Sequence, residues 1–373
     1  MYLAAQRSDL DQLQARGRRR TLAPRAGIDF ASNDYLALSG DPALAAAAAA
    51  ALADGVALGA GGSRLLRGNA PEHERLEAAA ARFFGVEAAL FLANGYAANV
   101  ALFSTLPQRD DLVLYDALIH ASAHDGMRLG RARACPVPHN DPDAVADAIR
   151  AHRRACPDGT VWIAVESLYS MDGDRAPLAE LADIADRHGA MLVIDEAHAT
   201  GVWGADGRGL AASLAGRPNV VTLKTFGKAL GCEGALVCGP AIVRDFLIAR
   251  ARPFIFSTAP SPLMAATAEA SLDLMAAAGA RRARLHSLIA FAERQLGPLG
   301  VTPTGTQILP LIVGEDSAAM ALAAALQEDG FDVRGIRPPT VPPGTARLRI
   351  SLTLNASEAD VAALADALGR RRK

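Results

Sequence analysis

Lysine is scarce in this sequence. Of 38 Lys and Arg residues, only Lys224, Lys228 and Lys373 are lysine, and all the others are arginine. A GC-rich coding bias explains this composition and also the many alanine runs. The consequence for function is specific, because any chemistry that needs a lysine amine inside the chain has only two candidates, Lys224 and Lys228.

Cysteine and net charge are also low. The four cysteines, Cys135, Cys156, Cys232 and Cys238, form no C-x-x-C pair and no zinc-type spacing. The sequence therefore predicts neither a metal site nor a disulfide framework. A formal net charge of -2 gives no basic footprint, so we expect no nucleic-acid partner.

No hydrophobic run is long enough to predict a membrane span. The most apolar run, Ala43 to Ala53, is shorter than the roughly 18 residues that a spanning helix requires. It predicts a water-exposed helix that begins after Asp41 as cap, with Pro42 in its first turn. We find no secretory signal pattern and expect a cytoplasmic protein without a membrane partner.

What the sequence does contain is an alternation of helical and strand-like segments in 373 residues. The predicted strands are Ala88 to Leu92, Leu112 to Tyr115, Val161 to Val165, Met191 to Ile194, Val220 to Leu223 and Ala235 to Cys238. Alanine-rich helices separate them. This alternation predicts an α/β fold with a mostly parallel sheet flanked by helices, whose functional groups collect at the carboxyl ends of the strands.

After about residue 270 the pattern changes to a smaller α+β arrangement. We predict strands at Gln307 to Val313, Phe331 to Arg334 and Arg347 to Thr353, and helices at Ser317 to Glu328 and Ser357 to Arg371. At the other end, residues 2 to 20 look helical, and a short strand is expected at residues 28 to 30. The predicted division is an N-terminal arm (1–39), a large domain (40–270) and a small C-terminal domain (271–373).

One strand end carries an unusual concentration of polar groups. The apolar run that starts at Met191 leads directly into Asp195, Glu196 and His198. The spelling Asp-Glu-Ala-His also occurs in the metal-binding box of some helicases, but a nucleotide-driven motor needs an upstream phosphate loop, G-x-x-x-x-G-K-[ST], and none is present. A solvated acidic turn is the simpler alternative.

The next strand supplies a lysine. Residues 220 to 231 form a strand that leads into a glycine-bearing turn around Lys228. A lysine amine can bind a carbonyl cofactor covalently, and an aspartate one strand away can pair with a pyridinium nitrogen. Lys228 and Asp195 therefore have the residue types of a pyridoxal phosphate site.

At this point a family resemblance becomes specific. Seven motifs occur in order along nearly the whole chain and together resemble the α-oxoamine synthase family of fold-type I pyridoxal phosphate enzymes. The motifs begin at Ser32 (SNDYL), Gly61 (GGSR), Asn94 (NGYAAN), Ser170 (SMDGD), Asp195 (DEAHATG), Thr225 (TFGK) and Leu348 (LRISLT). The resemblance implies an aspartate aminotransferase-like fold, the cofactor pyridoxal 5'-phosphate and a condensation of an amino acid with an acyl thioester that releases CO2.

Within this family, the compact length and the Arg-Arg-Arg … Asn-Asp-Tyr-Leu opening are most similar to members that join L-alanine to a pimeloyl thioester in biotin synthesis. The acyl carrier, CoA or acyl carrier protein, stays open. Glycine with acetyl-CoA, and serine with a long acyl group, are alternatives within the family. An ordinary aminotransferase of the same fold is a further alternative.

The resemblance implies catalytic roles for four residues. Lys228 resembles the lysine that carries the cofactor and moves the Cα proton, and Asp195 the partner of the pyridine nitrogen. His198 resembles the histidine that hydrogen-bonds the phenolic oxygen, and His120 the histidine that stacks on the cofactor ring. Ser170 resembles a hydroxyl contact on the phenolic side. No metal is expected.

The resemblance also implies phosphate and substrate contacts. Asn94, Gly95 and Tyr96 lie between a strand and a helix, where backbone N–H groups bind phosphate. Thr225 resembles a further phosphate contact. Ser257-Thr258 resembles the segment that reaches the phosphate from the neighbouring subunit, which implies an obligate homodimer. The substrate contacts implied by the resemblance are Arg18, Asn33, Arg349 and Thr353.

The motifs leave the register open at two positions. Arg19 and Arg20 adjoin Arg18, and the motif alone does not decide which of the three contacts substrate. Lys224 stands where members of this family usually have a small residue such as glycine. The motif register favours Lys228 as the cofactor lysine, which leaves Lys224 facing either the phosphate or solvent.

Overall fold

The computed structural model describes residues 2–372, which form two compact units. One unit is Asn33–Leu285, and the other combines the segment up to Ser32 with the segment from His286 onward. The arm that leads into the first unit is therefore grouped with the C-terminal part of the chain. Residues 1 and 373, the outer limits of the predicted domains, lie outside the described residues.

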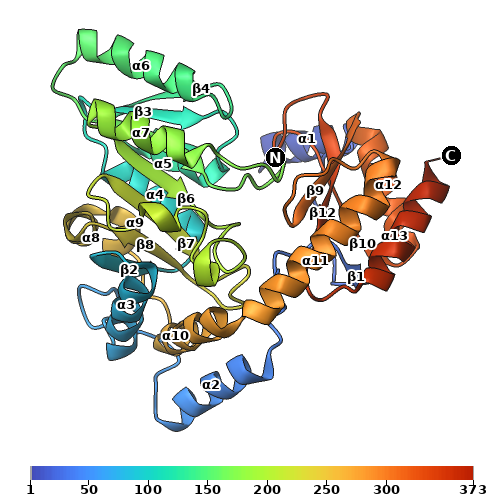
Figure 1. Ribbon diagram of the computed structural model, residues 1–373, viewed down its shortest axis with the longest axis horizontal. Helices are drawn as coiled ribbons and strands as arrows, with labels where there is room; N and C mark the ends of the chain where they lie inside the picture. Colours follow the sequence, from blue (N-terminus) through green and yellow to red (C-terminus); the bar gives the residue numbers. More distant parts are fainter. Residues whose placement is uncertain (1, 373) are drawn as a thin grey trace. The chain divides into compact units, whose positions relative to one another are not determined.

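The Asn33–Leu285 unit is built on a seven-stranded sheet of order β2-β8-β7-β6-β5-β3-β4 (Figure 1). The strands are β2 (Ala88–Leu92), β3 (Leu112–Asp116), β4 (Arg133–Val137), β5 (Val161–Glu166), β6 (Met191–Asp195), β7 (Val220–Thr225) and β8 (Ala235–Gly239). Only β8 runs antiparallel to its neighbours within this sheet. The prediction of a mostly parallel sheet is confirmed.

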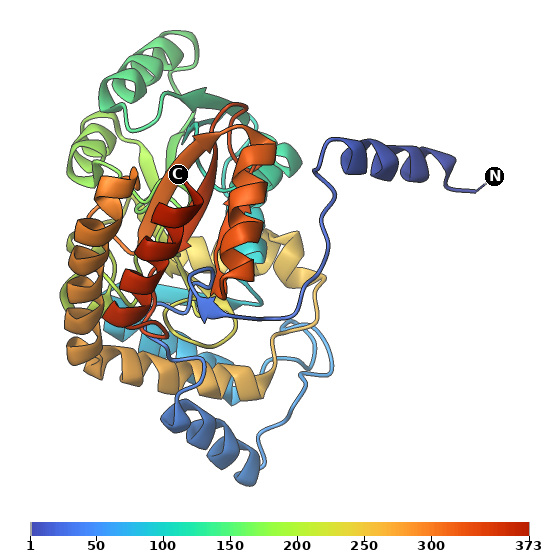
Figure 2. The same cartoon turned by 90° about the vertical axis from the view of Figure 1, so that its right-hand side faces the viewer.

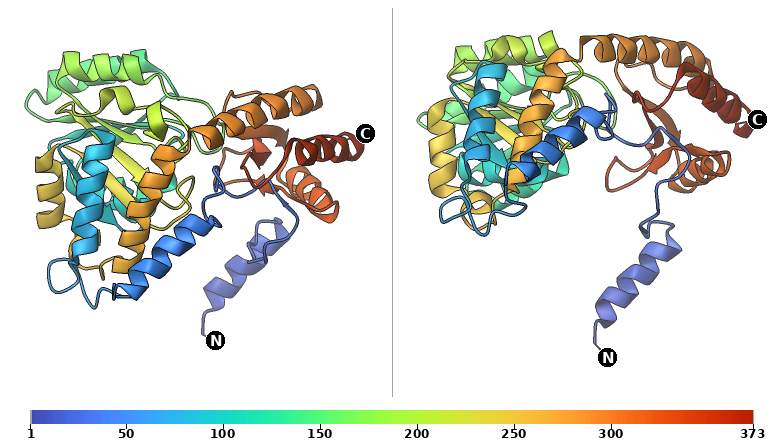
Figure 3. Two further views of the ribbon diagram at one scale, coloured as in Figure 1. Left: turned by 60° about the horizontal axis from the view of Figure 1, so that its bottom comes forward. Right: turned by 90° about the horizontal axis from the view of Figure 1, so that it is seen from below.

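Helices connect the strands from β2 to β6 in the order that the alternation predicts, and further helices precede β2 and follow β8. They are α2 (Pro42–Ala53), α3 (Pro71–Phe84), α4 (Gly95–Thr105), α5 (Ala121–Leu129), α6 (Pro142–Ala155), α7 (Leu178–His188), α8 (Ala241–Arg250), α9 (Arg252–Ile255) and α10 (Pro262–Ala277). The side chain of Asp41 caps α2, and Pro42 opens its first turn, as predicted. Helix α10 packs against α2 and α3 (Figure 3).

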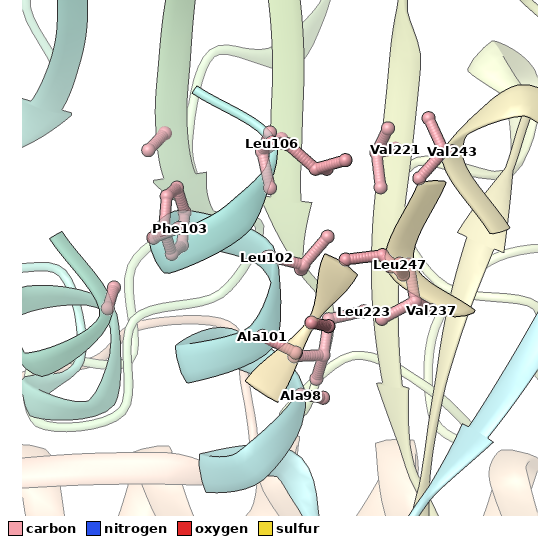
Figure 4. Close-up of a cluster of buried hydrophobic side chains, with 14 of the residues drawn as sticks. Ala98, Ala101, Leu102, Phe103, Leu106, Val221, Leu223, Val237, Val243 and Leu247 are labelled. Carbon is pink, nitrogen blue, oxygen red and sulfur yellow. The ribbon is translucent and has the colours of Figure 1, made fainter. Parts of the chain in front are cut away.

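Each face of the sheet has its own hydrophobic core. On one face, α4, α5 and α8 cover the strands, with Leu102, Phe103 and Leu247 among the buried side chains (Figure 4). On the other face, α6 and α7 bury Ile149 and Leu181 against the same strands. Because side chains alternate along a strand, each strand residue belongs to one face only.

The second unit contains a three-stranded antiparallel sheet of order β11-β12-β9 and a separate parallel pair, β1 with β10 (Figure 2). The elements are α1 (Ala4–Ala15), β1 (Ile28–Asp29), β9 (Ile308–Gly314), α12 (Asp316–Glu328), β10 (Phe331–Asp332), β11 (Arg334–Ile336), β12 (Ala346–Ser351) and α13 (Glu358–Arg371). Helix α11 (Gly279–Leu296) begins in the first unit and ends in the second.

Three local predictions need correction. The N-terminal helix ends at Ala15, before Gly17 adopts a left-handed conformation at φ 63°, so it does not continue to Arg20. The strand predicted at 331–334 is two strands, because β10 pairs with β1 whereas β11 pairs with β12. Strand β4 was not predicted at all: it is a mostly exposed edge strand that contains Pro136, a residue tolerated at such edges.

None of the helices described within residues 2–372 is long and apolar enough to cross a membrane.

Candidate active site

Asp195 ends β6 and is held rigidly on the α4 and α5 face of the sheet. Its Oδ2 accepts a hydrogen bond from Asn99 Nδ2 at 2.8 Å, and its Oδ1 accepts one from the backbone N–H of Ala197 at 2.9 Å. Asn99 lies on α4 and also donates to Ser122 Oγ at 2.9 Å. The carboxylate is mostly buried, with 8% of the residue exposed. These contacts fix its direction before any ligand binds.

Lys228 lies in the turn after β7 and contacts His198. Its Nζ is 2.8 Å from His198 Nε2, and His198 Nδ1 is 2.6 Å from Tyr35 Oη. Tyr35 in turn donates to Asn33 Oδ1 at 3.0 Å. His198 therefore bridges the lysine amine and the Tyr35 hydroxyl. This chain of polar contacts orients the lysine amine.

Lys224 faces the opposite side of the sheet. Along β7, Val221 and Leu223 belong to the core under α4, so Lys224 points to the other face. There its Nζ donates to a carboxylate oxygen of Glu196 and to the backbone carbonyl of Arg208, the latter at 2.9 Å. The open question about Lys224 is thereby answered: it forms a buried ion pair and faces neither a phosphate nor solvent.

The turn between β2 and α4 has the geometry of an anion site. Asn94 caps α4 by accepting from the backbone N–H of Ala97 at 2.8 Å. Helix geometry leaves the first amide groups, those of Gly95 and Tyr96, without an intrahelical acceptor. Thr225 at the end of β7 lies beside this turn, since a side chain on Gly95 would come within 3.9 Å of Thr225 Oγ1. The side chain of Tyr96 points elsewhere, with its hydroxyl donating to Asp125 at 2.7 Å.

His120 is the N-cap of α5 and is connected to Asp195 through polar contacts. Its Nδ1 is 2.7 Å from Ser122 Oγ and accepts from the Ser122 N–H at 3.2 Å. Ser122 Oγ also receives the Asn99 side chain, which holds Asp195. His120 is an exposed residue, and its ring is held at Nδ1. This is a suitable arrangement for stacking on a planar ligand.

Ser170 follows β5, where Glu166 and Asp195 are direct partners in neighbouring strands. The backbone N–H of Ser170 donates to Glu166 Oε2 at 3.1 Å. Burial, reinforced by the charge of Asp195, raises the pKa of Glu166 to about 8, although the Lys228 amine opposes the shift. Burial thus favours the neutral form of Glu166 beside Asp195.

The remaining predicted residues of this unit are more peripheral. Ser257 and Thr258 are exposed and follow the exposed ring of Phe256. The backbone N–H of Ala259 donates to Gly62 O at 2.9 Å, which anchors the end of this segment. Thr258 shares a small cavity with Ala97 of the same chain, on the first turn of α4. The side chain of Thr258 is thus accessible from the surface of this chain.

The other unit holds the predicted substrate arginines and Thr353. Arg349 lies in β12, is 6% exposed and donates to Ser351 Oγ at 2.5 Å. Thr353 is fully buried and accepts from the backbone N–H of Asn355 at 3.2 Å. Arg18 forms an ion pair with Asp316 at 2.6 Å, so a carboxylate of the same unit already neutralises part of its charge.

The residues in the Asn33–Leu285 unit fit pyridoxal phosphate. Pyridoxal phosphate presents an aldehyde, a pyridine nitrogen, a flat ring and a phosphate. The unit offers a group for each of these in turn: an amine held by a histidine, a carboxylate fixed by an amide, the imidazole of an exposed residue and a helix N-terminus. The arrangement can thus bind a charged aromatic aldehyde covalently and move protons beside it. Arg349, Thr353 and Arg18 stay predictions for the substrate side.

Four contributors were missed from the sequence as site residues. They are Tyr35, Asn99, Ser122 and Glu166, all of which contact or support a predicted residue. Asn99 was detectable, because an amide inside the apolar run 97–103 must be buried with a partner. Tyr35 lies far from His198 in sequence, so no local signal pointed to its contact.

The chain resembles known proteins along nearly its full length. The family profile described as aminotransferase class I and II matches residues 25–368. An 8-amino-7-oxononanoate synthase from Anaeromyxobacter dehalogenans is 44% identical over 366 residues, covering 93% of this chain and 90% of the relative. One from Bordetella petrii is 42% identical and covers 97% and 95%.

Solved structures give the same result. A serine palmitoyltransferase from S. paucimobilis, determined with PLP and myriocin bound, is 28% identical with a TM-score of 0.88 and covers 99% of this chain and 97% of its own. An 8-amino-7-oxononanoate synthase from Francisella tularensis is 28% identical with a TM-score of 0.77 and covers 93% and 98%. Both the predicted fold-type I architecture and the predicted family resemblance are confirmed. The chain belongs to the aminotransferase class I and II family.

Proposed function

We propose that this chain is an 8-amino-7-oxononanoate synthase: a pyridoxal phosphate-dependent C-acyltransferase that joins L-alanine to a pimeloyl thioester in biotin synthesis. The observation that carries the proposal is the Lys228–His198 contact beside the fixed carboxylate of Asp195. The 44% identity to a synthase of this name supports the choice of substrates.

In the overall reaction, alanine Cα loses a proton and forms a bond to the thioester carbonyl carbon as the thiol leaves. The bond to the carboxyl carbon then breaks, CO2 departs and Cα takes up a proton. Bound pyridoxal phosphate supplies the electron sink that this chemistry needs at Cα. Because decarboxylation removes a product as CO2, the condensation is effectively irreversible.

The chain's own residues provide binding and proton transfer. The Lys228 amine removes and returns the Cα proton, and His198 holds that amine through Nε2. Asp195 would hold a proton at the pyridine nitrogen of the bound cofactor, and His120 would stack on its ring. The amide groups at the start of α4, together with Thr225, bind the phosphate. Ser170 and His198 contact the phenolic oxygen.

Arg349 is proposed to bind the carboxylate of the amino acid, since its guanidinium matches a carboxylate geometrically and is held in a strand. Arg349→Ala should raise the KM for L-alanine about tenfold to a hundredfold, the cost of one charged hydrogen-bonding partner, and leave the cofactor absorbance intact. Arg334→Ala, which removes an ion pair to Asp332 in β10, is the control. An unchanged alanine KM would remove this role from Arg349. We propose that Arg18, Asn33 and Thr353 also contact the substrate.

A homodimer with a shared active site is also proposed. Phe256 is 71% exposed directly before Ser257 and Thr258, which suits a segment covered by a second copy. Phe256→Asp should shift the protein toward the monomer in sedimentation velocity runs and reduce activity in parallel. A monomeric wild-type enzyme with full activity would contradict this.

The decisive experiment is identification of the product by mass from L-alanine with pimeloyl-CoA and, separately, with pimeloyl acyl carrier protein. We expect 8-amino-7-oxononanoate from at least one donor. Serine palmitoyltransferase is the second candidate, because the solved structure of such an enzyme matches this chain with a TM-score of 0.88. Serine with palmitoyl-CoA is therefore tested in parallel. Glycine with acetyl-CoA is tested in the same way. A pyridoxamine form generated by an amino acid alone would instead indicate an aminotransferase.

A cytoplasmic location is proposed on the sequence pattern and is tested by cell fractionation.

A further inference from the structure

His139 lies between two carboxylates that the proposed chemistry does not use. Its Nδ1 is 2.8 Å from Asp116 Oδ1, and its Nε2 is 2.7 Å from Asp174 Oδ2. A neutral imidazole carries only one N–H, whereas each ring nitrogen here has a carboxylate oxygen as its nearest contact; the Asn140 amide nitrogen, 3.3 Å from Nε2, is farther away. The imidazolium satisfies both carboxylate contacts at once. Asp116 is almost fully buried, with 2% exposed, so this positive charge also balances a buried negative one.

Asn140 binds the same two carboxylates. Its backbone N–H donates to Asp116 Oδ2 at 2.8 Å, and its Nδ2 donates to Asp174 Oδ2 at 2.7 Å. The edge of the Tyr169 ring packs against His139 with the centroids 4.5 Å apart. Three separate segments, around residues 116, 139 and 170, are thus joined by a compact set of polar contacts.

Two of these segments lead to residues of the candidate site. Asp116 ends β3, and its Oδ1 accepts from the N–H of Leu118, two residues before His120. On the other side, the N–H of Tyr169 donates to Asp174 O at 2.9 Å, closing the turn that contains Ser170. The position of His120 relative to Ser170 therefore depends on the two carboxylates that His139 holds together.

We propose that His139, as an imidazolium, is a positioning residue. It sets the separation of His120 and Ser170 and thereby the shape of the cofactor site, without contacting the cofactor itself. This inference rests on the proposed function, because those two residues are assigned to the face and the phenolic edge of the cofactor. His139 itself touches neither cofactor nor substrate in this assignment.

The charges around His139 make its positioning contacts dependent on pH. Asp116 and Asp174 face the ring directly, and the buried Glu166 adds a further acid near Asp116. Burial opposes ionisation, but the two carboxylates prevail and raise the pKa of His139 to about 10. Since the folded pKa lies above the unfolded value of about 6.5, the stabilisation is fully present below that value and is lost as the pH rises toward 10.

The test uses the holoenzyme and compares His139→Gln with Asp174→Asn and the double variant. Glutamine can bind one carboxylate only, so we expect the dissociation constant of pyridoxal phosphate to rise about tenfold or more, the cost of a lost charged hydrogen bond. The visible circular dichroism per bound cofactor should fall. The double variant should be less impaired than the sum of the single changes predicts.

Two controls separate positioning from general damage. His188→Gln, a histidine at the end of α7 outside this set of contacts, should leave cofactor affinity and dichroism unchanged. The difference in melting temperature between wild type and His139→Gln should shrink above about pH 6.5 and vanish near pH 10. If His139→Gln does not fold, Asp174→Asn, whose side chain is 38% exposed, carries the test.

Unchanged cofactor affinity and dichroism in the folded variants would overturn the inference, even if their melting temperatures fall. Failure of the proposed function is distinguishable, because it would appear as the absence of 8-amino-7-oxononanoate from the wild-type reaction, whereas cofactor affinity and dichroism report on His139. A variant that binds cofactor normally but is merely less stable would assign His139 a structural role alone.

Discussion

Lys228→Ala should bind no cofactor covalently and should lose at least about 1,000-fold in turnover, since it removes both the covalent attachment and the base at Cα. The measurements are the visible absorbance of protein purified in pyridoxal phosphate and the rate of product formation. Lys228→Arg is the sharper companion, because arginine keeps the positive charge beside His198 but cannot form the covalent bond.

Both variants should fold, since Lys228 lies in a turn and belongs to neither hydrophobic core. Far-ultraviolet circular dichroism and the melting temperature check this. Turnover of either variant within tenfold of the wild type would show that the assignment of the cofactor lysine is wrong. An inactive alanine variant beside an active arginine variant would show that only the charge matters.

Lys224→Met should destabilise the protein by about 3–5 kcal/mol, which is the cost of leaving a buried charge without its partner. Glu196 is completely buried, and its Oε1 also accepts from the backbone N–H of Ala211 at 3.0 Å. The pair therefore fixes residues 208 to 211 against this face of the sheet. The shift of the urea unfolding midpoint measures the effect.

The matched comparison is Arg217→Met, which breaks an exposed ion pair to Asp186 and should cost no more than about 1 kcal/mol. The double variant Lys224→Met with Glu196→Gln should recover part of the loss, because no uncompensated charge then stays buried. A Lys224→Met protein as stable as the Arg217→Met protein would contradict this account. Lys224→Met should retain the cofactor absorbance when folded, which distinguishes it from Lys228→Ala.

The strands of the large sheet could be predicted because buried parallel strands are continuous apolar runs. For the same reason β4 escaped prediction, since an exposed edge strand with Arg133 and Pro136 lacks such a run. The strand order and the antiparallel direction of β8 depend on pairings between distant segments, which no local pattern records. The split of residues 331–336 into two strands has the same cause.

The predicted site was strongest where one motif holds both the chemistry and its surroundings. Asp195, His198 and Lys228 fall in two adjacent strand-to-turn motifs, and the structure places His198 and Lys228 in contact. Asn99, Tyr35 and the His139 contacts lie on segments separated from their partners by many residues. Their roles arise only when the chain folds, because their hydrogen-bond partners are distant in sequence.

The sequence by itself determined that only two internal lysines are available and that both lie around one strand end. Its motifs favoured Lys228 but left the second lysine without a role. The tertiary structure decided that role, because alternation along β7 directs Lys224 to the face of the sheet opposite Thr225, where Glu196 is buried. A side chain's face depends on which layers cover the strand, and that is a property of the assembled sheet.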